Sequence, residues 1–292
     1  MKLTNKLGLP QPFVEAVKRE YTYKEKQYSV TSLLKGTMQT ILERRYHDVI
    51  EQDVADMVWL IFGTAVHSVL ENAQEGAEEL KENKMIIPIG DYKLSGIFDL
   101  YNDKTKTVTD YKTGSVWKVI FDDWDDYKKQ LLCYAYMLRT IGFDCKRGEI
   151  VMLLKDFSKT KAKTDANYPN EPVYVKKFEF TEKEIEEAEK FIFAKFEEIK
   201  RCEKLSDDEL PVCTPTERWH KGDKYAVMKK GRKTAIRLCD SEEEAEKYIV
   251  WKGIDDGEHY VEFREGTDGK CVEYCNVNKY CPFYKKKYES NC

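Results

Sequence analysis

The chain has 292 residues and a net charge of −4, from 49 Lys and Arg against 53 Asp and Glu. With 41% hydrophobic and 35% charged residues it can bury a core, which excludes a wholly disordered protein. We find no run of about 18 apolar residues and no secretory signal, so we expect no membrane partner and a cytoplasmic location. Nine cysteines in such a chain are more often metal ligands or catalytic groups than disulfides.

Hydrophobic periodicity predicts an α/β protein. Residues 1–30 form a polar, aromatic N-terminal arm that contains Tyr21, Tyr23 and Tyr28. Helical spacing of apolar residues is found in four segments, about 31–47, 53–80, 125–142 and 181–205. Alternating or short apolar runs predict five strands, 85–90, 92–102, 106–114, 148–155 and 173–180. This order indicates a mixed central sheet flanked by helices.

The last third of the chain has a different pattern. Residues 222–266 predict a small β-β-α-β module, with a turn at Gly231 between its first two strands. The module lies between Cys213 and a cysteine-rich tail. We therefore divide the chain into three parts, an arm at 1–30, an α/β core at 31–212 and a cysteine-cluster lobe at 213–292.

The most informative stretch is GIFDLYNDKTKTVTDYKTG, residues 96–114. Side chains alternate along a strand, so Asp110 and Lys112 point to the same side, and the turn before them can bring Asp99 close to Asp110. Converging carboxylates need a positive charge between them, either a divalent cation or a lysine. Mg²⁺ or Mn²⁺ held there could polarise a phosphodiester and activate water. A surface hairpin with solvated Asp and Lys is the alternative.

Two neighbouring helices carry polar pairs four residues apart, which places each pair on one helical face. His67 and Glu71 form the first pair, and His67 is a candidate third metal ligand or a structural hydrogen bonder. Gln130 and Tyr134 form the second pair, which suits contacts to phosphates and bases but equally a half-buried amphipathic helix.

Together these motifs resemble the RecB-like branch of the PD-(D/E)XK nuclease superfamily, which includes phage exonucleases and CRISPR-associated nucleases. The matching segments are GTAVHSVLE (63–71), GIFDL (96–100), DYKTG (110–114) and Q-x-x-x-Y (130–134). The resemblance implies a restriction-endonuclease-like core whose metal ligands are His67, Asp99, Asp110 and the carbonyl of Tyr111. It further implies that Lys112 is the catalytic lysine, that Glu71 is the acid of the first helix, and that Gln130 and Tyr134 face the DNA.

Cys271, Cys275 and Cys281 give a C-x₃-C-x₅-C pattern, and Cys213 is our first choice for a fourth ligand. Cys202, Cys239 and Cys292 are substitutes for it. The same nuclease branch often holds a [4Fe–4S] cluster on one upstream and three C-terminal cysteines. This chain has one extra residue between the first two tail cysteines, and Cys213 follows the nuclease motifs instead of preceding them. Zinc, or thiols that bind no metal, are therefore alternatives.

We expect a metal-dependent DNA exonuclease of phage-recombination or repair type, working in a bacterial or phage-infected cytosol. Its substrate would be linear DNA ends, single- or double-stranded, and recombination proteins are candidate partners. The alternatives are a noncatalytic DNA-binding adaptor built on the same fold and a zinc-stabilised interaction module. The sequence does not set the oligomeric state.

Overall fold

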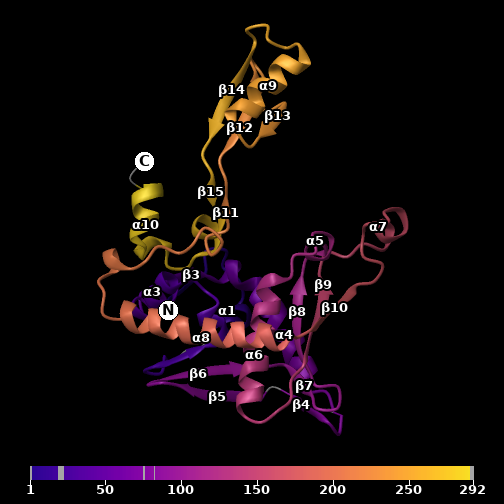
Figure 1. Cartoon of the computed structure of the whole chain (residues 1–292), viewed down its shortest axis with the longest axis vertical. Coiled ribbons are helices and arrows are strands. Elements are labelled where there is room, and N and C mark those ends of the chain that lie inside the picture. Colours follow the sequence, from indigo (N-terminus) through magenta and orange to yellow (C-terminus); the bar gives the residue numbers. More distant parts are fainter. Residues whose placement is uncertain (1, 19–22, 75, 82, 290–292) are drawn as a thin grey trace. The chain divides into compact units, whose positions relative to one another are not determined.

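The structure is a computed structural model that describes residues 2–18, 23–74, 76–81 and 83–289. It divides into two units, Met1–Leu210 and Pro211–Cys292 (Figure 1). Of the residues singled out above, Tyr21 and Cys292 lie outside the described residues. Unit 1 contains the nuclease-like motifs, and unit 2 contains Cys213 and the tail cysteines.

The main sheet of unit 1 has five strands in the order β10-β9-β8-β7-β4. Their bounds are β4 Glu79–Lys81, β7 Leu100–Asn102, β8 Thr107–Gly114, β9 Arg147–Leu154 and β10 Val173–Glu179. Strands β8 and β9 are parallel, and the other pairs are antiparallel. The sheet is therefore mixed, and the parallel pair is joined by a crossover that contains the helix α6, Asp125–Thr140.

A second sheet of unit 1 has the order β2-β6-β5, formed by Gln27–Ser29, Tyr92–Ile97 and Lys84–Ile89. The expected strand 92–102 is thus wrong, because β6 ends at Ile97 and β7 begins in the other sheet. Phe98 and Asp99 lie at the break, and both side chains are buried. Asp99 therefore lies in the short segment where the chain passes from the three-stranded sheet to the five-stranded sheet.

Two expected helices also end earlier than predicted. The segment 31–47 is split into α2 (Val30–Leu33) and α3 (Thr37–Arg45), because Gly36 is extended and caps the second helix. The segment 53–80 becomes a 3₁₀-helix, Val54–Met57, followed by α4, Val58–Glu71. A short helix not foreseen in the loop after β9 is α7, Lys159–Thr164.

The window Val54–Glu71 is long and apolar enough to cross a membrane, with a mean hydropathy of 1.3. Our expectation that no such run exists is therefore wrong. In this fold α4 contacts β8, and its His67 lies beside Asp99. Only 11% of the window is buried, and α4 itself has no buried residue, so most of this apolar surface is exposed in the described structure.

The long helix α8, Glu182–Cys202, begins as predicted with a capping box between Thr181 and Glu184. Its apolar face contacts α6 and α3 and buries Ile192 and Phe196. Just beyond its end, the Glu203 carboxylate accepts hydrogen bonds from the hydroxyls of Tyr28 and Tyr92 at 2.6 and 2.5 Å. These bonds join α8 to the three-stranded sheet.

Residues 1–30 are not a separate arm, since the described part of this stretch belongs to unit 1. Strand β1, Lys2–Thr4, pairs with β3, Glu51–Asp53, and β2 pairs with β6. Helix α1, Gln11–Val17, places Val17 in a small core with Val54 and Met57. Such pairings join residues far apart in the sequence, which local periodicity does not reveal.

Unit 2 contains the expected β-β-α-β module. Its sheet has the order β13-β12-β14, and α9 covers it around a core that includes Val227, Cys239 and Ile249. The bounds are β12 Lys224–Lys229, β13 Arg237–Cys239, α9 Glu242–Lys252 and β14 His259–Arg264. Gly253 ends α9 at φ 62°, a left-handed conformation that favours glycine. A ribbon of β11 (His220–Lys221) and β15 (Thr267–Asp268) precedes the short tail helices, which include α10, Pro282–Tyr284.

Candidate active site

The end of β8 is open on one edge, and this edge holds the candidate site. Strand β7 pairs with β8 only as far as Thr109, so the residues that follow lack a strand on that side. The N–H of Tyr111 instead donates to Oδ2 of Asp99 at 2.5 Å. Because N–H and C=O of one strand residue face the same side, the Tyr111 carbonyl also points to this edge. The sheet break thus brings Asp99 to β8.

Asp110 is 3% exposed and lies on the face of β8 that carries Lys112. The Lys112 ammonium contacts its Oδ2, and Gln130 Nε2 donates to its Oδ1 at 3.4 Å. Burial raises the pKa of the Asp110 carboxyl above its ordinary value, and the nearby Asp99 charge adds to this rise, while Lys112 opposes it. The predicted alignment of Asp110 and Lys112 is present.

His67 lies on α4 with Nδ1 3.2 Å from Oδ1 of Asp99. Its hydrogen bond to Asp99 raises the pKa of the imidazole, although partial burial opposes this. Glu71, one turn further along α4, is exposed, and the contact described for it is made by its carbonyl oxygen, which accepts from Lys81. The structure therefore brings His67 to the carboxylates but does not bring Glu71 there.

Gln130 and Tyr134 share one face of α6, as predicted, and both are buried. Gln130 Nε2 donates to the Tyr134 hydroxyl at 3.0 Å as well as to Asp110. The Tyr134 ring packs against Gly96 of β6, and a Cβ atom at position 96 would lie only 3.0 Å from the ring. The pair was expected to face DNA, but its contacts here orient the Asp110 carboxylate.

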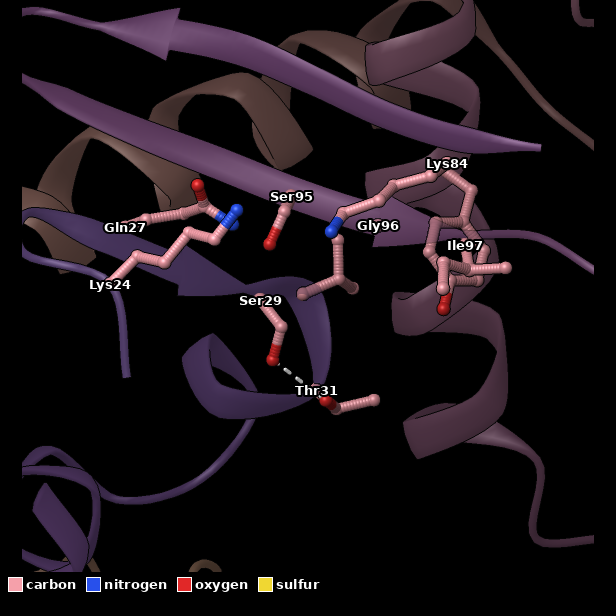
Figure 2. A pocket seen from close by; sticks show the side chains of 10 residues that line it. Lys24, Gln27, Ser29, Thr31, Lys84, Ser95, Gly96 and Ile97 are labelled. Atoms are coloured by element: carbon pink, nitrogen blue, oxygen red, sulfur yellow. Dashed lines mark hydrogen bonds between the residues drawn. The ribbon is translucent and has the colours of Figure 1, made fainter. Parts of the chain in front are cut away.

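On its other side Tyr134 lines a pocket of about 320 Å³ against the three-stranded sheet (Figure 2). Lys24 and Lys84 extend into this pocket from opposite sides, with Ser95 between them. Neither ammonium has an ion pair with a described acidic residue. The pocket therefore presents positive charge beside α6, the helix whose Gln130 donates to Asp110.

The comparisons with known proteins give the family of the chain. The model of the PD-(D/E)XK nuclease superfamily matches residues 75–282. The chain belongs to the PD-(D/E)XK nuclease superfamily. The match extends through the tail cysteines up to Pro282, and His67 precedes it.

Two solved structures are similar to this PD-(D/E)XK protein. A crystal structure of SSO0001 is 20% identical, with a TM-score of 0.41, and the alignment covers 60% of this chain and 79% of that one. A phage-related exonuclease from Haemophilus somnus 129PT is 11% identical, with a TM-score of 0.36, covering 59% and 92%. No curated protein matches the sequence. The family assignment rests on the superfamily model and not on these two structures.

The donor set of this PD-(D/E)XK site fits a hard divalent cation. Two carboxylates and an imidazole converge, and Asp110 Oδ2 is buried with no hydrogen bond among the described residues, only the contact with Lys112. Across the described ranges, no three His, Cys, Asp or Glu side chains already surround one metal-sized point. The acids instead pair with Lys112 and His67, so the donors are neighbours rather than a closed coordination shell.

The four predicted cysteines of the PD-(D/E)XK chain lie in unit 2, near enough for the charges of three of them to act on Cys271, but among the described residues no three of them already surround one metal-sized point. Burial raises the pKa of the Cys271 thiol to about 12, and the charges of Cys275, Cys213 and Cys281 contribute. All four are partly buried. The substitutes Cys202 and Cys239 are instead fully buried in separate cores, so they do not replace Cys213.

Beside these cysteines, the Asp268 carboxylate is fully buried and accepts four side-chain hydrogen bonds. Arg218 and His220 contact its Oδ1 at 3.0 and 2.9 Å, and Lys287 and Tyr288 contact its Oδ2 at 3.2 and 2.9 Å. Although burial opposes ionisation, these bonds lower the pKa of Asp268 to about 2. Asp268 thus joins both strands of the β11–β15 ribbon to the tail.

Sequence reasoning missed Tyr127 in this PD-(D/E)XK site. Its ring centre lies 5.6 Å from Lys112 Nζ and 4.8 Å from Lys118 Nζ. Tyr127 precedes Gln130 by three residues and Tyr134 by seven, so helical spacing alone places it on the same face of α6. The sequence did not indicate that Lys24 and Lys84 line one pocket, because they are brought there by the pairing of β2 and β5 with β6, and these strands are far apart in the chain.

Proposed function

We propose that the chain is a metal-dependent DNA exonuclease of phage-recombination or repair type, which hydrolyses phosphodiester bonds. The observation that supports this is the convergence of Asp99, Asp110 and Lys112 on the open edge of β8, with His67 beside them. Membership of the nuclease superfamily implies a nucleic-acid substrate. DNA, and cleavage from linear ends, are part of the proposal.

In this proposal Asp99, Asp110, His67 and the Tyr111 carbonyl hold Mg²⁺ or Mn²⁺. The bound ion would supply a Lewis acid for the scissile phosphate and lower the pKa of water. Lys112 places a positive charge at the same edge, where it offsets charge developing on the phosphate oxygens and orients the attacking water. Gln130 keeps Asp110 in the required rotamer.

The pocket beyond Tyr134 offers a path for the substrate strand. Lys24 and Lys84 have no described acidic partner, so they are available to phosphate oxygens. Tyr134 lines this pocket and accepts from Gln130, which also donates to Asp110, so the pocket is connected to the carboxylates through these two side chains. The pocket thus supports nucleic acid as the ligand of this face.

We further propose that Cys213, Cys271, Cys275 and Cys281 hold a [4Fe–4S] cluster, with Zn²⁺ as the alternative. Four neighbouring thiols in one unit suit either group. Its role would be structural, because metal binding to such a lobe contributes directly to its folding. We place the protein in the cytoplasm, where recombination proteins are candidate partners.

A noncatalytic DNA-binding adaptor is the main rival. The burial of Asp110 near a second carboxylate argues against the adaptor, because this burial lowers the free energy of unfolding. A protein that only binds DNA would gain nothing from keeping the two carboxylates together. A zinc-stabilised interaction module would explain the tail but not the edge of β8.

The decisive experiment incubates the full chain with linear and circular DNA, single- and double-stranded, with Mg²⁺, Mn²⁺ or EDTA. Lys112→Ala is compared with Lys177→Ala, which removes a lysine from the exposed side of β10. Metal-dependent loss of linear DNA in wild type and Lys177→Ala, but not in Lys112→Ala, supports the exonuclease. Cleavage of circles makes it an endonuclease, and no cleavage with any metal favours the adaptor.

A further inference from the structure

An exposed aromatic pair follows the catalytic strand directly. Helix α5, Val116–Ile120, begins two residues after Gly114, the last residue of β8. Trp117 and Phe121 lie one helical turn apart and stack, with ring centres 5.6 Å apart and planes at 23°. They are 55% and 71% exposed. Two large rings are thus presented to the surroundings close to Lys112.

The pair is held in place by its backbone. Asp156 accepts hydrogen bonds from the Ser115 hydroxyl at 2.6 Å and from the Val116 N–H at 2.8 Å. The Ser115 side chain in turn caps the helix by accepting from the N–H of Trp117, and Val116 is buried beneath it. The position of the rings is therefore set before any ligand binds, which limits the entropy lost on binding.

Lysines lie at this end of β8 together with acidic residues. Asp122 and Asp123 follow Phe121 directly, and they pair with Lys176 and Lys118. Lys118 of the same helix shares the Tyr127 ring with Lys112, and it also pairs with Asp123 at 3.4 Å. At the same end of β8, the N–H of Lys155 donates to the Gly114 carbonyl, and its ammonium lies 4.0 Å from the centre of the Trp59 ring. Aromatic faces mixed with cations match a chain of bases and phosphates. They suit an apolar protein or lipid surface less well, because the lysines would lose their water.

We propose that Trp117 and Phe121 stack on unpaired bases of the strand that enters the site. Inside a duplex both faces of a base are covered by its neighbours, so only unpaired or terminal bases can use the rings. The substrate would therefore be single-stranded over these positions, either a single strand or a frayed duplex end. This inference rests on the proposed function, because it names the form of nucleic acid that the β8 site receives.

The test measures binding of a short fluorescein-labelled oligodeoxythymidylate without added divalent metal, so that cleavage does not interfere. A second probe has the same backbone with abasic sites in place of the bases. The variants are Trp117→Ala, Trp117→Tyr and Trp251→Ala, the last as a control because Trp251 is 73% exposed on α9 of unit 2.

We expect Trp117→Ala to bind the oligodeoxythymidylate about 5- to 150-fold more weakly, as the loss of one stacked base predicts. Binding of the abasic probe should change little, because its phosphates still meet the lysines. Trp117→Tyr and Trp251→Ala should both bind as wild type does.

Equal weakening on both probes, or no weakening on either, overturns the stacking proposal. So does a change in sedimentation of Trp117→Ala relative to wild type, which would make the pair a contact between copies of this chain. If wild type binds anionic phospholipid vesicles and Trp117→Ala does not, the stacking proposal is also overturned, because the ligand of the rings would then be a membrane surface. The two proposals can fail separately. If Lys112→Ala abolishes cleavage but Trp117→Ala weakens both probes equally, only the stacking proposal is refuted. If Trp117→Ala weakens only the probe with bases but wild type cleaves no DNA, only the exonuclease proposal is refuted.

Discussion

The backbone N–H of Tyr111 donates a 2.5 Å hydrogen bond to Oδ2 of Asp99. This bond takes the place of the strand pairing that β8 lacks beyond Thr109. It fixes Asp99 next to Asp110 without a turn of special sequence. The site therefore depends on where β7 ends as much as on the acidic residues themselves.

The contact between Lys112 and Asp110 should stabilise the fold as well as serve chemistry. Lys112→Met leaves the buried carboxylate without its counter-charge, so the free energy of unfolding should fall by about 1–3 kcal/mol. The double variant Asp110→Asn/Lys112→Met removes that charge and should recover much of the loss. Urea unfolding near neutral pH measures both. A double variant less stable than Lys112→Met would show that the ion pair is not the cause.

Gln130 should act as a positioning residue for metal binding. Gln130→Leu removes the donor to Asp110 Oδ1, so we expect the Mg²⁺ concentration at half-maximal cleavage to rise roughly 10- to 100-fold. Tyr134→Phe keeps the Gln130–Asp110 bond and serves as the matched control, with a smaller rise. Equal rises in the two variants would assign the effect to packing of α6.

Stability of the β11–β15 ribbon should depend on pH through Asp268. The folded-state pKa of about 2 lies below the ordinary 3.8, so its ionised form stabilises the native state by about 2 kcal/mol. This contribution is complete above the unfolded pKa and is lost as pH falls toward about 2. Asp268→Asn should therefore speed amide exchange in β11 and β15 at pH 7 but differ less from wild type near pH 3. Asp255→Asn, at an exposed position of unit 2, should match wild type throughout.

The cysteine cluster makes a separate prediction. Cys275→Ala should lower the iron or zinc content per chain and the melting temperature, because one of four ligands is lost. Cys239→Ala is the control, since Cys239 is buried in the module core and should affect stability but not metal content. Metal analysis of the purified variants measures both, and unchanged metal in Cys275→Ala would refute the cluster.

Much of the site could be predicted because its residues obey local periodicity. The alternation of β8 aligns Asp110 with Lys112, and the four-residue spacing on α6 aligns Gln130 with Tyr134. The β-β-α-β module was predicted for the same reason, since its strands are close in sequence. The coarse class, a mixed α/β fold, followed from these elements, and the nuclease-like core was implied by the resemblance of the motifs.

The errors have a common physical origin in long-range pairing. The switch of sheets at Phe98, and the pairing of β1 and β2 with distant strands, leave no periodic signal. Apolar spacing continued past Glu71, so the helix was extended too far. Glu71 was a candidate because it lies four residues after His67 and matches the family's helix acid, but spacing does not show which way the helix faces. The burial of Gln130 depends on packing around Asp110, which spacing cannot supply.

The parallel pairing of β8 with β9 has a consequence for synthesis of the protein. Asp110 lies opposite Ile150, forty residues later in the chain. A nascent chain that has left the ribosome only as far as Tyr134 carries the four matching motifs but lacks β9, the strand that pairs with β8 beside Asp110. The nuclease activity that we propose should therefore appear during translation only after β9 has emerged, later than the completion of the motifs.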